Sequence, residues 1–284
     1  MATLATSLRL RKAERGRFGD PLLLVSAALA VGIAVVAVAG PWIAPYDPAA
    51  TDVLAASQGP SGAHLFGTDS LGRDIFSRAL TGARLSFAGP GIIVLGSAGL
   101  GTLLAVAAAW HGGWVDRLLN RTLSMLFAIP GVLVAVIAAA VFGAGFWAPV
   151  LALTIVYTPY VARVVRSVAV RQRQLPYVEA LQLAGLSTWR ICGRHLLPNV
   201  APIVLAQATI GFGSALVDFG AVSFLGLGVQ PPEAEWGLMV ADGRSEVLDG
   251  AVQQSLAAGL CIVVSVVAFN VLGERLTQRF GGTR

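Results

Sequence analysis

Residues 179–199, Glu-Ala-Leu-Gln-Leu-Ala-Gly-Leu-Ser-Thr-Trp-Arg-Ile-Cys-Gly-Arg-His-Leu-Leu-Pro-Asn, form a polar segment between two apolar stretches, 147–167 and 200–226. A helix needs about 20 mostly apolar residues to cross the hydrocarbon core of a membrane, and each flanking stretch supplies them. The polar segment is therefore expected to be a short helical element outside the membrane, held between two spans.

The composition of the whole chain supports this interpretation. Its 284 residues are 56% hydrophobic and 12% charged, with a mean hydropathy of +0.74, which exceeds what a soluble domain of this length buries. The apolar runs are continuous and not alternating, which argues against a β-barrel. The sequence predicts an all-α polytopic membrane protein with six transmembrane helices, at 22–44, 85–109, 122–142, 147–167, 200–226 and 251–273.

The distribution of charge predicts the orientation, because basic residues in short loops resist translocation. If the amino-terminal tail is cytoplasmic, all of the 20 Lys and Arg lie inside except Arg73, Arg78, Arg84 and Arg244. The two loops then placed outside hold most of the 15 acidic residues. We therefore expect both termini in the cytoplasm. The net charge of +5 follows from this topology and gives no support for nucleic-acid binding.

These features divide the chain into five parts. The first apolar run is interpreted as a retained span, because it is too long for a cleaved signal peptide and lacks a small-residue cleavage site before Pro41. The predicted parts are a basic tail (1–20), the first span (21–45), an extracytoplasmic loop (46–84), a core with five spans (85–273) that includes a cytoplasmic loop (168–199), and a cytoplasmic tail (274–284).

The chain offers little catalytic chemistry. Its three histidines and two cysteines lie in separate segments without metal-ligand or nucleophile spacing: His64, His111, His195, Cys192 and Cys261. A phosphate-binding loop of the Walker A type requires a lysine, and the only lysine, Lys12, lacks that pattern around it. We expect no enzymatic activity and no cofactor bound by this chain.

The polar segment has helix punctuation at both ends. Pro176 suits the first turn of a helix, Glu179 favours the positive end of the helix dipole, and Gly185 supplies a left-handed stop. An apolar face of this helix would comprise Tyr177, Val178, Leu181 and Ala184. A second short helix would start at Ser187 and end where Pro198 redirects the chain.

Four ordered stretches resemble the permeases of binding-protein-dependent ABC importers. Glu179-Ala180, Gly185 and Leu197-Pro198 match the EAA loop of that family, E-A-A-x3-G-x9-I-x-L-P, with Leu181 where many relatives have alanine. Three further stretches resemble the C-type subunit of its dipeptide, oligopeptide and nickel branch: 66–78 (FGTDSLGRDIFSR), 223–232 (SFLGLGVQPP) and 236–237 (WG). The resemblance covers residues 20–275.

The resemblance implies a type I ABC importer permease (MetI-like) fold in the inner membrane of a bacterial cell, and a division of labour. Separate ATPase subunits, two or one fused, would bind ATP and Mg²⁺ and dock on the cytoplasmic loop. The residues that would couple to them are Glu179, Ala180, Leu181, Gly185, Leu197 and Pro198. A second, B-type permease subunit would complete the path, and an extracytoplasmic binding protein would deliver the substrate.

Two other regions are candidates for function. Residues 75–80 show helical apolar spacing, which predicts an amphipathic helix at the outer membrane interface. With Asp69, Arg73, Asp74 and Arg78 it would form a lid packed on the chain itself or a platform that faces the binding protein, and these two interpretations are compatible. Asp218 is the one acidic residue within the predicted spans, near the outer leaflet, and would either contact a cationic group of the substrate or form a structural hydrogen bond.

The substrate class stays open between alternatives. Di- and oligopeptides are the first expectation, and nickel or another chelated metal is the second. A secondary transporter without ATPase would predict inverted repeats and coupling-ion ligands, neither of which is evident, and a membrane receptor or scaffold would need a signalling domain.

Overall fold

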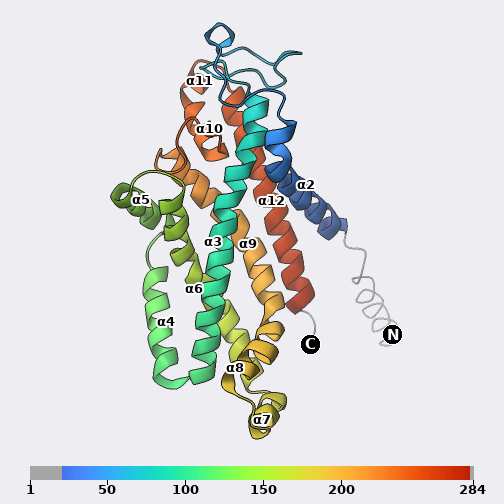
Figure 1. The fold of residues 1–284 in the computed structure, drawn as a ribbon, viewed down its shortest axis with the longest axis vertical. Helices are drawn as coiled ribbons and strands as arrows, with labels where there is room; N and C mark the ends of the chain where they lie inside the picture. The colour runs from blue at the N-terminus through green and yellow to red at the C-terminus, as the bar shows by residue number, and fades with distance from the viewer. Residues whose placement is uncertain (1–20, 282–284) are drawn as a thin grey trace, which may run out of the picture.

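The computed structural model describes residues 21–281 and is helical throughout, without β-strands in that range (Figure 1). The helices are α2 (Pro21–Ile43), α3 (Ile75–His111), α4 (Gly113–Phe127), α5 (Gly131–Phe142), α6 (Trp147–Arg173), α7 (Pro176–Leu183), α8 (Thr188–Ile191), α9 (Leu197–Phe224), α10 (Trp236–Asp242), α11 (Arg244–Leu248) and α12 (Gln253–Gly281). A 3₁₀ turn (Val53–Ala55) and a π-helical turn (Cys192–Leu196) complete the regular structure. The all-α prediction is confirmed, and the predicted tail 1–20 lies outside the described residues.

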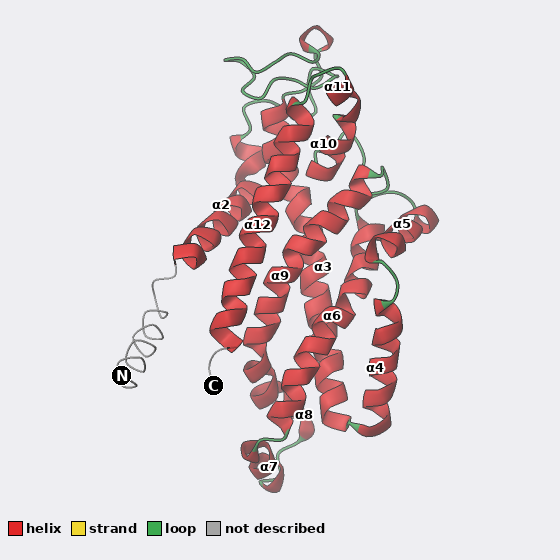
Figure 2. Cartoon of the chain, turned by 180° about the vertical axis from the view of Figure 1, so that it is seen from behind, coloured by secondary structure: helices red, strands yellow, loops and turns green. Residues whose placement is uncertain are grey.

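The long helices form an elongated bundle around α3. Helix α7 projects beyond one end of the bundle, which we call the α7 end. Helices α10 and α11 and residues 44–74 cap the opposite end, which we call the α10 end (Figures 1 and 2). Five helical segments are long and apolar enough to cross a membrane: α2, α3, α6, Thr188–Phe224 and α12 as far as Arg279. The pair α4 and α5 makes a sixth if the two are counted as one bent span.

Small residues bring α3 and α6 close together. A Cβ on Gly101 would lie 2.9 Å from the Thr158 carbonyl oxygen, and one on Gly96 would lie 2.7 Å from a methyl carbon of Thr154. Lipid gives no hydrophobic drive for helix association, so close backbone approach is the main source of packing energy in such a bundle. Gly99 has open space on its side of α3, so it does not contribute to this contact.

The second span begins ten residues before its predicted start. Helix α3 starts at Ile75, where the Asp74 carboxylate caps it by accepting from the Ser77 N–H at 2.8 Å. The predicted separate amphipathic helix at the membrane interface is therefore wrong, because residues 75–84 are the first turns of a continuous helix. Ile75 and Arg78 are both fully buried, so the polar side of this segment meets protein partners and not water.

The third span is not one straight helix over 122–142. Helix α4 starts at Gly113, and α4 and α5 meet at an angle of 81° across residues 128–130. Pro130 explains the break, because its ring clashes with the preceding turn and it restricts the backbone of Ile129.

The sequence predicted that Pro198 would redirect the chain, but in the structure it does not. It lies in the first turn of α9, and Thr188–Phe224 passes through it as one helical segment. The π-helical turn immediately before it supplies the physical reason, since widening the helix there accommodates a residue that lacks an N–H. At the carboxyl end, α12 continues past the predicted span limit of 273 into the predicted tail.

Candidate functional site

Helix α7 has the punctuation that the sequence predicted. Pro176 occupies its first turn, and Gly185 follows its last turn with a φ of +76°. The Gly185 N–H donates to the Gln182 carbonyl at 3.0 Å, and the Leu186 N–H donates to the Leu181 carbonyl at 3.2 Å. These two bonds form a Schellman motif, which ends a helix sharply and needs a residue that tolerates positive φ.

The contact face of α7 differs from the predicted one. The predicted face was Tyr177, Val178, Leu181 and Ala184, of which Val178 is buried, Tyr177 and Leu181 are half-buried and Ala184 is exposed. Leu183 is 84% exposed, and Trp189 in α8 is 88% exposed. Helix α7 thus presents a small apolar face (Ala180, Leu183, Ala184) outward, and Val178 is its one buried residue.

Polar and apolar contacts brace the segment against the bundle. The Tyr177 hydroxyl donates to Gln172 Oε1 at 3.1 Å and accepts from Asn199 Nδ2 at 3.2 Å, which ties α7 to both α6 and α9. Ile191 and Leu196 are fully buried. The other predicted coupling residues, Glu179, Ala180, Leu197 and Pro198, are exposed. The segment is therefore a fixed projection with a free outer side.

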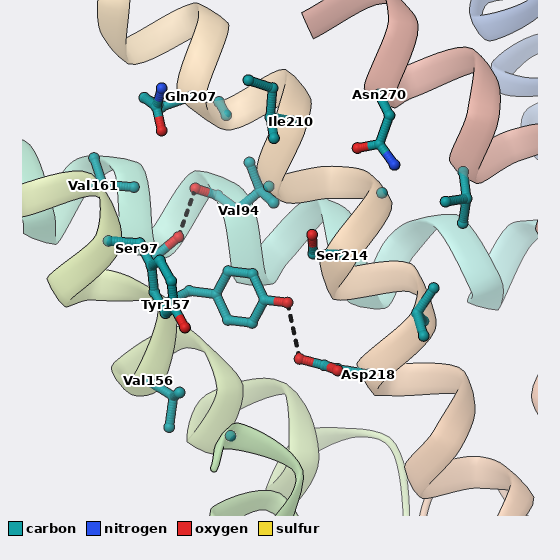
Figure 3. A pocket seen from close by; sticks show the side chains of 17 residues that line it. Val94, Ser97, Val156, Tyr157, Val161, Gln207, Ile210, Ser214, Asp218 and Asn270 are labelled. Atoms are coloured by element: carbon teal, nitrogen blue, oxygen red, sulfur yellow. Dashed lines mark hydrogen bonds between the residues drawn. The ribbon is translucent and has the colours of Figure 1, made fainter. Parts of the chain in front are cut away.

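A cavity of about 620 Å³ lies among α3, α5, α6, α9 and α12 (Figure 3). Its wall is mostly apolar, with a few polar side chains that include Ser97, Gln207, Ser214 and Asn270. Asp218 lines it and accepts a hydrogen bond of 2.9 Å from the Tyr157 hydroxyl. The predicted structural hydrogen bond of Asp218 is therefore present, and the same carboxylate also faces a cavity.

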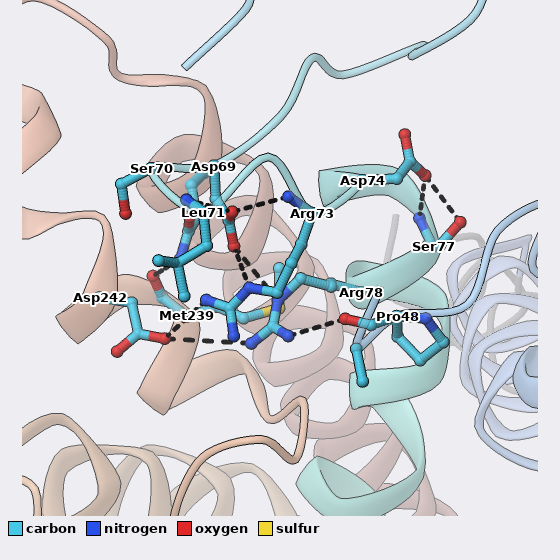
Figure 4. Close-up of polar contacts among 12 residues, drawn as sticks. Pro48, Asp69, Ser70, Leu71, Arg73, Asp74, Ser77, Arg78, Met239 and Asp242 are labelled. Carbon is cyan, nitrogen blue, oxygen red and sulfur yellow. Dashed lines mark hydrogen bonds and ion pairs between the residues drawn. The ribbon is translucent and has the colours of Figure 1, made fainter. Parts of the chain in front are cut away.

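The predicted outer charges form a buried network at the α10 end (Figure 4). Arg73 Nε donates to Asp69 Oδ2 at 2.6 Å, and Arg78 Nη1 donates to the Pro48 carbonyl at 2.9 Å. Asp242 lies 3.6 Å from Arg73 and 3.9 Å from Arg78. Burial raises the pKa of Asp242, while the two arginines act to lower it.

Burial shows what these four side chains contact. Asp69, Arg73, Asp74 and Arg78 are each at most 5% exposed, so they pack within their own chain. Asp74 also pairs with His64 Nδ1 at 2.9 Å. The alternative of a lid packed on the chain itself agrees with this geometry.

Sequence reasoning missed another buried acid at this end, Glu235. It is fully buried and caps α10 by accepting from the N–H groups of Gly237 (3.0 Å) and Leu238 (2.9 Å). The Ser86 hydroxyl of α3 donates to the same carboxylate at 3.0 Å. Burial raises the pKa of Glu235, and these hydrogen bonds oppose that shift. An acidic residue directly before Trp236 was the available signal, since Asp and Glu favour helix starts.

Within residues 21–281, no group of three or more His, Cys, Asp and Glu side chains is placed to hold a metal ion. The site geometry thus consists of a braced projecting loop, an apolar cavity with one carboxylate, and a buried charge network that closes the opposite end.

Comparison with known families accounts for this combination. The model of the binding-protein-dependent transport system inner membrane component matches residues 99–282, and that of the N-terminal TM domain of oligopeptide transport permease C matches residues 18–60. The chain belongs to the binding-protein-dependent transport permeases. It is therefore a multi-pass inner-membrane subunit of an ABC importer, with the type I permease fold that the sequence predicted.

Curated relatives resemble the permease over most of its length. A probable D,D-dipeptide transport system permease protein of Escherichia coli K12 is 38% identical over 259 residues, covering 90% of this chain and 86% of that protein. A putative peptide transport system permease protein of Brucella suis is 40% identical over 272 residues, covering 95% and 88%. A dipeptide transport system permease protein of Alkalihalophilus pseudofirmus is 35% identical over 257 residues, covering 90% and 84%.

Proposed function

We propose that this permease imports di- or oligopeptides as one half of a heterodimeric translocation path. Relatives named for dipeptide and peptide transport, at 35–40% identity, support a peptide substrate over a chelated metal. A B-type permease subunit would supply the other half of the path, and an extracytoplasmic binding protein would load it. The cavity beside Asp218 has the mixed apolar and hydrogen-bonding lining that a peptide requires.

In this proposal the α7 end lies in the cytoplasm, with both termini, and the α10 end faces outward. Arginines around the α7 end, such as Arg171, Arg190 and Arg194, favour that orientation. Two ATPase subunits, or one fused ATPase, bind ATP and Mg²⁺ there. The transported peptide then moves from the α10 end towards the α7 end.

The observation that carries the coupling proposal is the exposed apolar side of a braced loop. Leu183 and Trp189 are large apolar side chains left almost entirely uncovered on a segment that is otherwise fixed to α6 and α9. Such a surface suits a hydrophobic cleft on a soluble partner, because burial of apolar area drives association. The predicted coupling residues form and support this projection: Glu179, Ala180, Leu181, Gly185, Leu197 and Pro198.

The test uses a photoreactive residue in the assembled transporter. A photocrosslinking amino acid replaces Leu183 in one variant and Leu248, an 86% exposed leucine at the α10 end, in the control. We expect the ATPase to be captured from position 183 and not from position 248, in vesicles that take up peptide in an ATP-dependent manner. Capture of the ATPase from position 248, or uptake without any crosslink at 183, would contradict the proposed docking.

Uptake itself tests the substrate class. Vesicles that contain the permease and its partner subunits are supplied with the cognate binding protein and a panel of radiolabelled dipeptides and tripeptides. ATP-dependent accumulation of at least one peptide is expected. Accumulation of Ni²⁺ with no peptide accumulation would replace the peptide proposal with the metal alternative.

A further inference from the structure

The membrane cavity contains one charged group among its described lining residues, the carboxylate of Asp218. None of the ion pairs formed by residues 21–279 includes it, and its hydrogen-bond partner is the neutral hydroxyl of Tyr157. We propose that Asp218, oriented by Tyr157, is a subsite that accepts an ammonium group of the substrate as it passes through the cavity. This inference rests on the proposed function and extends it to a named group.

Burial disfavours a negative charge at position 218, whereas two contacts favour it. Tyr157 donates to one carboxylate oxygen, and the amino-terminal end of α5 is close by, since a Cβ on Gly131 would lie 3.8 Å from Asp218 Oδ2. The start of a helix carries a partial positive charge and stabilises a nearby anion. The carboxylate is therefore held without being neutralised by a cationic side chain of its own chain.

The position of Asp218 on α9 places it at the end of a polar stripe. Gln207, Ser214 and Asp218 are separated by seven and four residues, so they share one face of the helix, and all three line the cavity (Figure 3). Gly211 lies on the same face without a side chain, which leaves room between them. Hydroxyl and amide groups match the peptide backbone, and a carboxylate matches the ammonium of a free amino terminus or a basic side chain.

The open side of the carboxylate distinguishes this arrangement from a purely structural hydrogen bond. A bond that only joined α6 to α9 would need no access from the cavity, yet Ser214, one turn away on α9, is exposed to it. Ionisable residues that face a cavity within a membrane protein usually belong to the path of the transported species. Asp218 is ionisable and lines the cavity, so it meets both conditions.

The test measures electrostatic potential with thiol reagents in the assembled transporter. Cys192→Ser and Cys261→Ala remove the two native thiols, and Ser214→Cys introduces a probe beside Asp218. The rates of modification by cationic 2-aminoethyl methanethiosulfonate and anionic 2-sulfonatoethyl methanethiosulfonate are compared. Gln207→Cys is the matched control probe, because it lies in the same cavity but about 16 Å from Asp218 along the helix.

We expect the cationic-to-anionic rate ratio at position 214 to exceed that at position 207 by at least about tenfold, and Asp218→Asn to abolish the excess. The comparison of positions 214 and 207 retains Asp218, so it keeps the proposal falsifiable if Asp218→Asn fails to assemble. Equal ratios at the two positions, or an excess that survives Asp218→Asn, would overturn the proposal.

A second readout connects the subsite to the substrate. The peptide with the fastest uptake in the panel above is added with its binding protein and ATP. It should slow modification of position 214 by the cationic reagent when Asp218 is present, and protect less when it is Asn. Equal protection of position 214 with Asp and with Asn at position 218 would show that Asp218 does not interact with the substrate. If no peptide is taken up, the proposed function fails, while the reagent ratio still decides whether a cation subsite exists.

Discussion

The guanidinium of Arg166 in α6 donates two hydrogen bonds of 2.5 Å to the carboxylate of Asp116 in α4. A second contact on the same pair of helices places the Arg163 guanidinium 4.3 Å from the ring centre of Phe127. No side chain of α4 is fully buried, so these two contacts are a large part of what holds it. They join the segment before the 81° bend to the helix that leads into α7.

Arg166→Lys should loosen α4, because a lysine cannot form the paired hydrogen bonds of the guanidinium. We expect faster amide hydrogen exchange in residues 113–127, corresponding to about 1 kcal/mol of lost local stability, and a lower ratio of peptide imported to ATP hydrolysed. Arg171→Lys is the control, since Arg171 is exposed and bonds only the Ser167 carbonyl of its own helix. Unchanged exchange in α4 would show that the pair does not fasten it.

Gly185→Ala should weaken coupling to the ATPase. A φ of +76° costs a residue with a Cβ about 1 kcal/mol or more, so the Schellman motif would distort and α7 would change direction. We predict a reduction of several-fold in the ATPase activity stimulated by the loaded binding protein, with normal amounts of assembled transporter. Gly193→Ala is the control, because that glycine has no positive φ and an added methyl group there would meet no atom within 4 Å. Equal stimulation of ATPase activity in Gly185→Ala and Gly193→Ala would show that coupling does not depend on the positive φ of Gly185.

Gly101→Ala should separate α3 from α6. The added methyl group would lie 2.8 Å from the Val161 Cβ and 2.9 Å from the Thr158 carbonyl oxygen, so one helix must shift. Overpacking of this kind typically costs about 1–3 kcal/mol, which predicts a lower thermal unfolding midpoint and a lower yield of assembled transporter. Gly99→Ala, with open space on its side, should leave both unchanged. A similar loss in the two variants would point to helix flexibility in place of close packing.

Glu235→Gln should destabilise the α10 end at every pH between about 5 and 8, because the amide NH₂ would oppose one of the N–H donors that the carboxylate accepts, at a cost of about 1–3 kcal/mol. The pKa of Glu235 is raised in the folded protein, with burial as the main cause. A raised folded pKa contributes stability that is present at low pH and lost as the pH rises through it.

The gap in unfolding midpoint between the wild type and Glu235→Gln should therefore be largest at acid pH and narrow as the pH increases. Unfolding midpoints measured by differential scanning calorimetry over this pH range show whether the gap narrows or widens. Glu233→Gln, an exposed neighbour, serves as the control. A gap that widens with rising pH would contradict a raised pKa.

The sequence predicted the features that depend on residues close together in the chain. The apolar runs located the spans because helix formation in lipid requires only length and composition. Pro176 and Gly185 located the ends of α7 because proline and glycine act within their own turn. The resemblance at the EAA loop and at residues 66–78, 223–232 and 236–237 then identified the family.

What the sequence could not predict depends on partners distant in the chain. Arg78 looked like the polar side of a surface helix, but it is buried against Pro48 and near Asp69 and Asp242. The cap that Glu235 forms on α10 has local donors, but its burial against the Ser86 hydroxyl, 149 positions earlier, could not be predicted from the sequence. The size of the bend at Pro130 is likewise set by packing, since a proline specifies a break but not its angle.

The unbroken segment from Thr188 to Phe224 has the dimensions of a lever. Its 37 residues extend over about 55 Å at 1.5 Å per residue, with Asp218 only about 9 Å from the far end. If the segment pivots near Phe224, a tilt of about 5° moves its α7 end by about 5 Å but moves Asp218 by less than about 1 Å. A large displacement of the loop at the α7 end thus produces only a small displacement at the cavity. The π-helical turn lies far from the pivot, where a small loss of stiffness would absorb the most displacement.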